Sequence, residues 1–245
     1  MIIDAYNHLW RARPNAPELF MHQALTPEQF VAEMDRTGID MAVVCPLGQD
    51  LDNEYIGEAV RAYPNRLIGF LEVNPRDADA PAQMRALVER YHFSGLKLHP
   101  TLMGHPVSSH PLMDPIFKTC AELGLAVYGH SMHDFWNVPL QYEEMARSFP
   151  SVPVILGHMG MIWSVAEAGM VARRNPNVYL ETSFVSLRSL EIGIQLAGAE
   201  KVVMGTDWPG NHFDLQLEMV RRATKSAEAF ELVAGRNLAR VLNIG

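Results

Sequence analysis

Apolar segments alternate with amphipathic helical segments eight times along the 245 residues of the chain, and this alternation constrains the fold more than any other feature. Strict alternation of strands and helices is typical of a parallel sheet. Eight repeats in this length favour a single-domain, closed (β/α)8 TIM barrel over an open doubly wound sheet. The predicted strands are residues 2–5, 41–45, 67–73, 96–99, 126–129, 154–157, 178–181 and 201–205.

Local signals place helices between these strands. Thr26 can cap a helix whose first residue is Pro27 and which ends near Gly38. Gly124 ends the helix predicted over 114–123, and Pro150 stops the one over 140–149. Further helices are predicted over residues 54–63, 79–91, 186–196, 213–223 and 226–242, with one more ending near residue 174. We expect residues 100–110, which include two prolines, a glycine and two histidines, to be an irregular loop.

Composition argues against several classes of protein. Hydrophobic residues make up 48% of the chain, enough for a large core, and a net charge of −8 argues against a nucleic-acid or anionic-membrane partner. The two cysteines, Cys45 and Cys120, are expected to be reduced thiols in a cytoplasmic protein. No basic region followed by a long apolar stretch occurs near residue 1, so we expect neither a signal peptide nor a transmembrane segment. A small-molecule substrate is therefore the expected partner, and a homodimer is left open.

Metal-capable side chains follow five of the predicted strands. They are His8, His99, His130, His158 and Asp207, and they lie at the end of the barrel where active sites are found. Closure of the barrel makes Asp207 a neighbour of His8, and adjacent strands bring His130 next to His158. Imidazole and carboxylate suit zinc and related divalent ions, with water completing a catalytic site. The structural alternative is that each histidine is merely hydrogen-bonded and that Asp207 caps the next helix.

Lys97 is a candidate for binding substrate. It shares a side of its strand with His99, and it faces the barrel interior if the leucines beside it face the helices. A buried amine needs a charge partner, so Lys97 either holds a substrate carboxylate, pairs with Asp207 or forms a structural salt bridge. Other candidates lie in loops after strands, where the tryptophans either line the pocket or pack in the core and the histidines are placed to touch substrate. They are Trp10, Trp136, Trp208, His105 and His133.

Six motifs occur in order along the whole chain. They are Ile3-Asp4-Ala-x-x-His8-Leu-Trp10, Gly95-Leu-Lys97-Leu-His99-Pro100, Gly129-His130, Leu156-Gly157-His158-Met-Gly160, Glu181-Thr182-Ser183 and Gly205-Thr-Asp207-Trp-Pro209. Together they resemble the amidohydrolase superfamily, and more narrowly the amidohydrolase-related branch that includes aminocarboxymuconate-semialdehyde decarboxylase. The resemblance implies that His8, His130 and Asp207 bind one divalent metal ion such as zinc. It also implies that His158 is the acid–base residue and that Asp207 can take a proton from metal-bound water.

The first motif departs from the family pattern at Tyr6. The family usually has His-x-His at this position, whereas this sequence has Tyr6-Asn7-His8. A neutral phenol is a poor ligand unless the metal ion deprotonates it. Three outcomes are open: His8, His130 and Asp207 hold the metal more weakly, Tyr6 binds it as a phenolate, or the site has lost its metal. We expect a mononuclear site.

The sequence supports three functional hypotheses. The main one is metal-dependent hydrolysis of a small ester, lactone or amide, in which metal-activated water attacks the carbonyl and His158 carries the proton. The second is non-oxidative decarboxylation of an aromatic or muconate-like acid, with Lys97, Arg11 or Arg13 holding the carboxylate. The third is a barrel that binds a ligand or partner without chemistry. Specificity is expected to lie in loops 11–25, 100–113 and 131–139.

Overall fold

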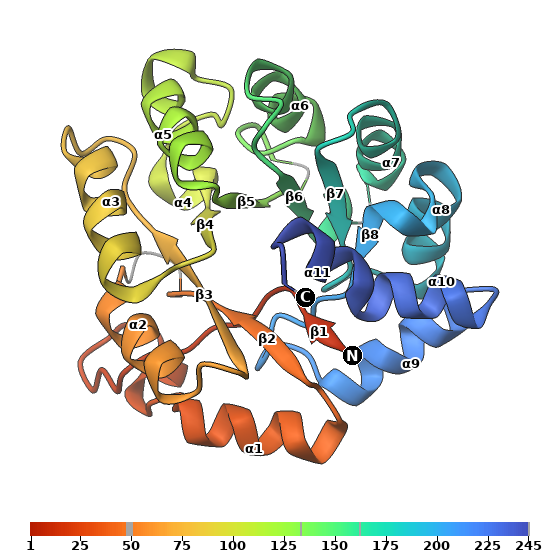
Figure 1. The fold of residues 1–245 in the computed structure, drawn as a ribbon, viewed down its shortest axis with the longest axis horizontal. Coiled ribbons are helices and arrows are strands. Elements are labelled where there is room, and N and C mark those ends of the chain that lie inside the picture. The colour runs from red at the N-terminus through yellow and green to blue at the C-terminus, as the bar shows by residue number, and fades with distance from the viewer. Residues whose placement is uncertain (48–50, 133, 162, 245) are drawn as a thin grey trace.

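Eight parallel strands surrounded by helices form a barrel in this computed structural model, which describes residues 1–47, 51–132, 134–161 and 163–244 (Figure 1). Strands that follow one another along the chain are neighbours in the sheet, and every pairing from β1–β2 to β7–β8 is parallel. The strands are β1 (Ile3–Asp4), β2 (Met41–Val44), β3 (Leu67–Glu72), β4 (Gly95–Leu98), β5 (Ala126–His130), β6 (Val154–Gly157), β7 (Val178–Glu181) and β8 (Val202–Val203). The predicted TIM barrel is confirmed.

The barrel closes between the segments that follow β1 and β8. The Ala5 N–H donates to the Met204 carbonyl at 2.8 Å, and the Asp207 N–H donates to the Tyr6 carbonyl at 2.7 Å. Main-chain hydrogen bonds therefore bring the segment that carries Asp207 beside the one that carries His8, as the predicted strand order requires.

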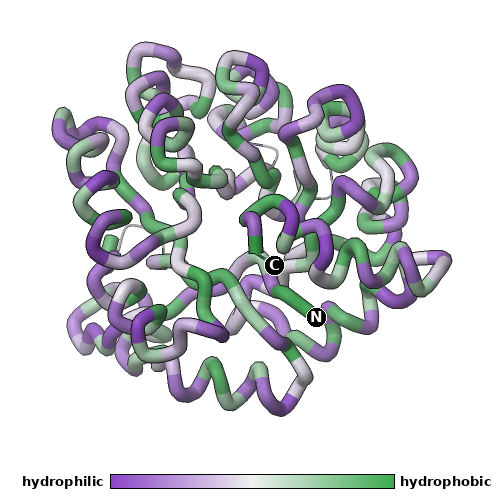
Figure 2. Tube along the Cα trace, viewed as in Figure 1, coloured by the Kyte–Doolittle hydropathy of each residue, from purple (hydrophilic) through white to green (hydrophobic). Residues whose placement is uncertain are grey.

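Alternate side chains along each strand divide the core into two parts. One cluster fills the barrel interior and includes Tyr128 of β5 and Ile155 of β6. The other lies between the strands and the helices and includes Leu96 and Leu98 of β4. Because side chains alternate between the two faces of a strand, Lys97 faces the interior, as predicted, and is only 2% exposed. Figure 2 shows apolar strands inside the barrel and polar positions along the outer edges of the helices.

The helices cover the outside of the barrel. Those with α geometry are α1 (Pro27–Thr37), α2 (Asn53–Ala62), α3 (Ala80–Tyr91), α4 (Pro100–Met103), α5 (His110–Leu123), α6 (Pro139–Ser148), α7 (Val165–Arg174), α8 (Leu187–Ala197), α9 (Phe213–Ala223), α10 (Ala227–Glu231) and α11 (Asn237–Val241). Short helical turns of other types are η1 (Leu19–His22), η2 (His158–Gly160), η3 (Ala199–Lys201) and η4 (Leu232–Arg236). Thr26 caps α1 as predicted, because its hydroxyl accepts a hydrogen bond from the Gln29 N–H and the Gln29 side chain accepts one from the Thr26 N–H.

The prediction of an irregular loop over residues 100–110 holds for residues 104–109 and is wrong at its two ends. Residues 100–103 form α4, because the His99 ring accepts a hydrogen bond from the Leu102 N–H at 3.4 Å and so caps the turn. Helix α5 begins at His110, before the predicted start at residue 114. Prolines in a first helical turn cost no hydrogen bond, so they do not exclude a helix there. In the described ranges, no helix is long and apolar enough to cross a membrane.

Candidate active site

The five metal-capable residues lie at the carboxyl ends of strands, as predicted. His130 ends β5, while His99 and His158 directly follow β4 and β6. His8 and Asp207 follow β1 and β8 after short segments. His158 and Asp207 have φ angles of 60° and 59°, a conformation that is uncommon outside glycine and that is found preferentially at functional sites. The side chains form two groups, each held by one hydrogen bond between side chains and by a further close contact, rather than one cluster.

The first of these, called the Tyr6 group below, consists of Tyr6, His8 and Asp207. The Tyr6 hydroxyl lies 2.8 Å from His8 Nε2, and the same nitrogen lies 3.4 Å from Asp207 Oδ1. The other ring nitrogen, His8 Nδ1, lies 2.8 Å from the Pro46 carbonyl, which can only accept. Nδ1 therefore carries the proton of the neutral ring, and Nε2 accepts a hydrogen bond from the Tyr6 hydroxyl.

Burial determines the protonation of the Tyr6 group. It lowers the pKa of His8 to about 3, with a smaller contribution from the Lys97 charge. It raises the pKa of Asp207 to about 7, against the opposing effect of Lys97. The contact between His8 and Asp207 is therefore not an ion pair at neutral pH, because His8 is neutral. A carboxyl group whose pKa is raised toward neutrality can serve as a proton donor or acceptor near pH 7.

The second group, called the histidine group below, consists of His99, His130 and His158. The His99 ring stacks on the His130 ring with centroids 3.8 Å apart, and His130 Nδ1 lies 3.1 Å from His158 Nε2. Burial lowers the pKa of His99 and of His158 to about 3, and that of His130 well below its ordinary value. All three rings are therefore neutral near pH 7. The Tyr6 ring lies between the two groups, with its centroid 5.7 Å from that of His158.

Glu181 and Ser183, which carry no predicted role, orient His158. The buried Glu181 carboxylate accepts hydrogen bonds from the N–H groups of His158 and Ser183 and from the hydroxyls of Ser183 and Tyr128. Because the Ser183 hydroxyl donates to Glu181, its oxygen can accept from His158 Nδ1, which lies 2.9 Å away. A carboxylate at the end of the buried segment 178–181 is the sequence signal that could have identified Glu181, since the same pattern singled out Asp207.

A further buried carboxyl group, Asp4, fixes the main chain that leads to Asp207. It accepts hydrogen bonds from the Tyr6 N–H at 3.0 Å, from the Asn7 side-chain amide at 2.8 Å and from both the N–H and the hydroxyl of Thr206. Burial raises the pKa of Asp4 to about 7, and these hydrogen bonds oppose the rise. Asp4 of β1 therefore holds Thr206, the residue before Asp207, and fixes the position of Asp207 beside the segment that follows β1.

Lys97 packs against aromatic rings in the barrel interior. Its Nζ lies 4.3 Å from the centroid of the Tyr6 ring and 4.6 Å from that of Tyr128, as in cation–π contacts. No hydrogen-bond partner of Nζ is found among the described residues. Lys97 therefore makes no direct bond to Asp207, but its charge lowers the pKa of Asp207 and of His8.

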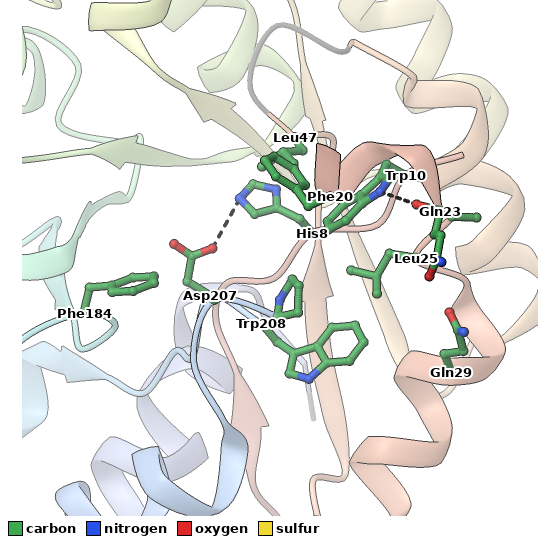
Figure 3. Close-up of a pocket in the computed structure, with 13 residues that line it drawn as sticks. His8, Trp10, Phe20, Gln23, Leu25, Gln29, Leu47, Phe184, Asp207 and Trp208 are labelled. Carbon is green, nitrogen blue, oxygen red and sulfur yellow. Dashed lines mark hydrogen bonds and ion pairs between the residues drawn. The ribbon is translucent and has the colours of Figure 1, made fainter. Parts of the chain in front are cut away.

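A cavity of about 710 Å³ opens beside the Tyr6 group, a size that suits a small molecule (Figure 3). His8 and Asp207 face one another at its wall, and Gln23 and Gln29 contribute amides. The aromatic side chains that line it are Trp10, Phe20, Phe184 and Trp208. Trp10 and Trp208 thus lie where the sequence placed them, whereas Phe20 and Phe184 were not predicted.

Other predicted contacts do not line this cavity. Trp136 is 39% exposed, and His105 is buried with its Nδ1 3.2 Å from the Pro106 carbonyl. Arg11 forms ion pairs with two carboxylates at α2. His133 lies outside the described residues. The wall of the cavity is therefore built mainly by the loops after β1, β7 and β8.

The residues predicted to bind a metal ion do not converge. No three His, Cys, Asp or Glu side chains in the part of the chain that the structure describes stand close enough together to hold one. His8 and Asp207 are neighbours, but the Tyr6 hydroxyl occupies His8 Nε2, and His130 is hydrogen-bonded to His158. As arranged, these residues do not fit a divalent ion.

One protein-family model matches almost the whole chain. The family model described as amidohydrolase matches residues 3–244, and this confirms the resemblance inferred from the motifs. A search of curated proteins finds no match.

Solved structures resemble the chain over its whole length. A 2,6-dihydroxybenzoate decarboxylase from Rhizobium matches with a TM-score of 0.80 and 15% identity, covering 99% of this chain and 98% of that one. A 5-carboxyvanillate decarboxylase from Novosphingobium aromaticivorans, complexed with manganese, matches with a TM-score of 0.77 and 19% identity, covering 99% and 96%. A probable 2-pyrone-4,6-dicarboxylic acid hydrolase from Acinetobacter baumannii matches with a TM-score of 0.75 and 15% identity, covering 99% of each chain. At these identities the likeness shows the shared fold.

Proposed function

Because the chain belongs to the amidohydrolase family, we propose that it catalyses the non-oxidative decarboxylation of a small aromatic acid, with Asp207 as the proton donor. The observation that carries this proposal is the carboxyl group of Asp207, whose pKa burial raises to about 7, at the wall of an aromatic cavity. A proton donor is most effective when its pKa lies near the working pH. An aspartate with an ordinary pKa would have lost its proton at neutral pH.

The proposed reaction uses the acid and the apolar wall together. The bond between the ring carbon and the carboxylate breaks, and its electron pair remains on the ring carbon. CO2 leaves, the ring carbon takes the proton of Asp207, and solvent returns a proton to Asp207. The aromatic side chains of the cavity stack with the substrate ring and keep water from the carboxylate, which favours the loss of its charge.

Lys97 supplies the positive potential that a carboxylate substrate requires. Its charge lowers the pKa of histidines in both groups, including His8 and His158, so its potential extends across the site. The same potential favours an anion in the cavity. A direct contact between Lys97 and the substrate carboxylate, the first alternative from the sequence, would add to this long-range attraction.

Hydrolysis was the main hypothesis from the sequence, but the solved structures that resemble the chain favour decarboxylation. The names of two of the structures described above are those of decarboxylases of substituted benzoates. Hydrolysis of a lactone is a second candidate because Ser183 and Glu181 fix the orientation of the His158 ring beside the cavity-lining residues after β7. One of the three structures is that of a probable lactone-type hydrolase, the 2-pyrone-4,6-dicarboxylic acid enzyme.

A labelling experiment separates these reactions. Purified protein is incubated with hydroxylated benzoates in deuterium oxide and, separately, with pyrone lactones in heavy-oxygen water. We expect CO2 release and one deuterium on the ring carbon that carried the carboxylate. Asp207→Asn should lower kcat by about 10²- to 10⁴-fold, the usual contribution of a positioned acid. Glu89→Gln, which changes an exposed carboxylate on α3, is the matched control.

Two outcomes would contradict the proposal. Heavy oxygen in a ring-opened product, without CO2 from any benzoate, would indicate the hydrolase. Absence of both reactions across the substrate panel would favour a barrel that binds a ligand without chemistry.

A further inference from the structure

Tyr6 lies between the two groups of histidine and carboxylate side chains at the candidate site. Its side chain is 3% exposed, and its ring lies 4.8 Å from the His8 ring and 5.7 Å from the His158 ring, measured between centroids. The residue contacts both members of its own group, because its hydroxyl reaches His8 and its carbonyl accepts the Asp207 N–H at 2.7 Å. A single residue therefore connects the two expected ligands that remain neighbours.

The direction of the hydrogen bond to His8 removes the lone pair that a metal ion would use. Pro46 fixes the proton of His8 on Nδ1, which leaves Nε2 as an acceptor. A phenol with its ordinary pKa of about 10 keeps its proton at neutral pH, so the Tyr6 hydroxyl has a proton to donate to Nε2. Metal binding at Nε2 would have to break this 2.8 Å hydrogen bond inside a buried site.

Both ring nitrogens of His158 in the histidine group are likewise engaged in hydrogen bonds. The Ser183 hydroxyl donates to Glu181 and accepts from His158 Nδ1, so the proton of the neutral His158 ring is on Nδ1. His158 Nε2 then accepts from His130 Nδ1 at 3.1 Å, and that nitrogen of His130 carries a proton as well. Two nitrogens that could bind a metal ion are thus committed to a hydrogen bond with one another.

Lys97 opposes a second positive charge at the same place. Its Nζ lies 4.3 Å from the centroid of the Tyr6 ring, on the interior side of the site. Like charges repel strongly in a buried environment, where the effective dielectric constant is low.

We propose that Tyr6 takes the place of the metal ion in this barrel: its hydroxyl holds His8, its carbonyl holds the Asp207 segment, and the site binds no divalent cation. Tyr6 is in this sense a positioning residue. The inference does not depend on whether the reaction is decarboxylation or hydrolysis, since it concerns the contacts of Tyr6 and not the substrate.

Metal binding by the purified protein tests this inference without an activity assay. Wild type, Tyr6→Phe and Tyr6→His are each dialysed against ZnCl2 or MnCl2, freed of unbound metal and analysed for metal content, and affinities are measured by titration calorimetry. Tyr6→Phe keeps the ring stacked on Tyr128 at 4.1 Å and removes only the hydroxyl. Tyr6→His adds a ligand beside His8. Far-UV circular dichroism shows whether each variant is folded.

We expect wild type to carry much less than one ion per chain. Tyr6→Phe should bind more tightly than wild type, and Tyr6→His tighter still, by roughly 10- to 100-fold over wild type, the range in which ligand and outer-shell changes act on metal sites. The gain should disappear when His8→Asn is added. One ion per chain in wild type that is lost in His8→Asn would overturn the inference. A folded Tyr6→His variant that binds metal no more tightly than wild type would also overturn it. If Tyr6→His does not fold, a folded Tyr6→Phe variant that binds metal no more tightly than wild type would overturn it instead.

Discussion

Replacing Asp207 with asparagine should stabilise the protein in a way that depends on pH. Burial raises the pKa of this carboxyl group from 3.8 to about 7, so the folded protein favours its protonated form. A group whose pKa is raised by folding contributes stability at low pH, and that contribution is lost as pH rises through the pKa of the folded state. Asparagine resembles the protonated carboxyl group and cannot ionise.

The size of the effect follows from the two pKa values. Ionising Asp207 in the folded state costs roughly 4 kcal/mol more than ionising it in the unfolded chain. The unfolding free energy that protonated Asp207 contributes is lost between about pH 4 and about pH 7, and none of it remains above that range. Between pH 5 and pH 8, wild type should therefore lose about 2 to 3 kcal/mol of unfolding free energy relative to Asp207→Asn.

Urea denaturation at pH 5, 6, 7 and 8 measures this difference. The altered contact with His8 adds a constant offset, so the change with pH is the quantity that tests the argument. Glu89→Gln, on the exposed face of α3, should track wild type throughout. A difference that does not vary with pH, or that favours wild type increasingly as pH rises, would mean that the site stabilises the ionised carboxylate. The proton-donor role of Asp207 would then lose its basis.

Three other changes test the supporting residues. Ser183→Ala removes the hydroxyl between His158 and Glu181 and should lower the unfolding free energy by about 1 to 3 kcal/mol, because a buried ring N–H loses its acceptor; urea denaturation measures this. Gly205→Ala should lower the unfolding free energy by about 1 to 3 kcal/mol, seen as a reduced Tm, because a Cβ there would lie 2.3 Å from Glu181 Oε1. Lys97→Met removes the charge that lowers the pKa of Asp207, so the alkaline limb of the kcat/KM profile, which we expect near pH 7 in wild type, should move to higher pH. An unchanged limb would show that Lys97 does not act on the proton donor.

The fold could be predicted because its signals are local and repeated. A two-residue period places Lys97 inside the barrel once its neighbours are assigned to the helical layer, and the structure confirms this. The helix at residues 100–103 was missed because its signal is not a repeated pattern along the chain. Helix α4 depends on a hydrogen bond to the ring of His99, a side chain that the sequence presented only as a candidate for the active site.

Neighbouring residues at the site were also predictable, but their bonding was not. Strand order alone brings Asp207 beside His8 and His130 beside His158, and both contacts are present. Whether such residues bind a metal ion or one another depends on where their protons lie. That is decided by acceptors from other parts of the chain: the Pro46 carbonyl fixes one ring, and Ser183 fixes another. A motif records the residue types but not these acceptors. A single hydroxyl in place of a ligand can therefore change what the site binds while the pattern around it stays intact.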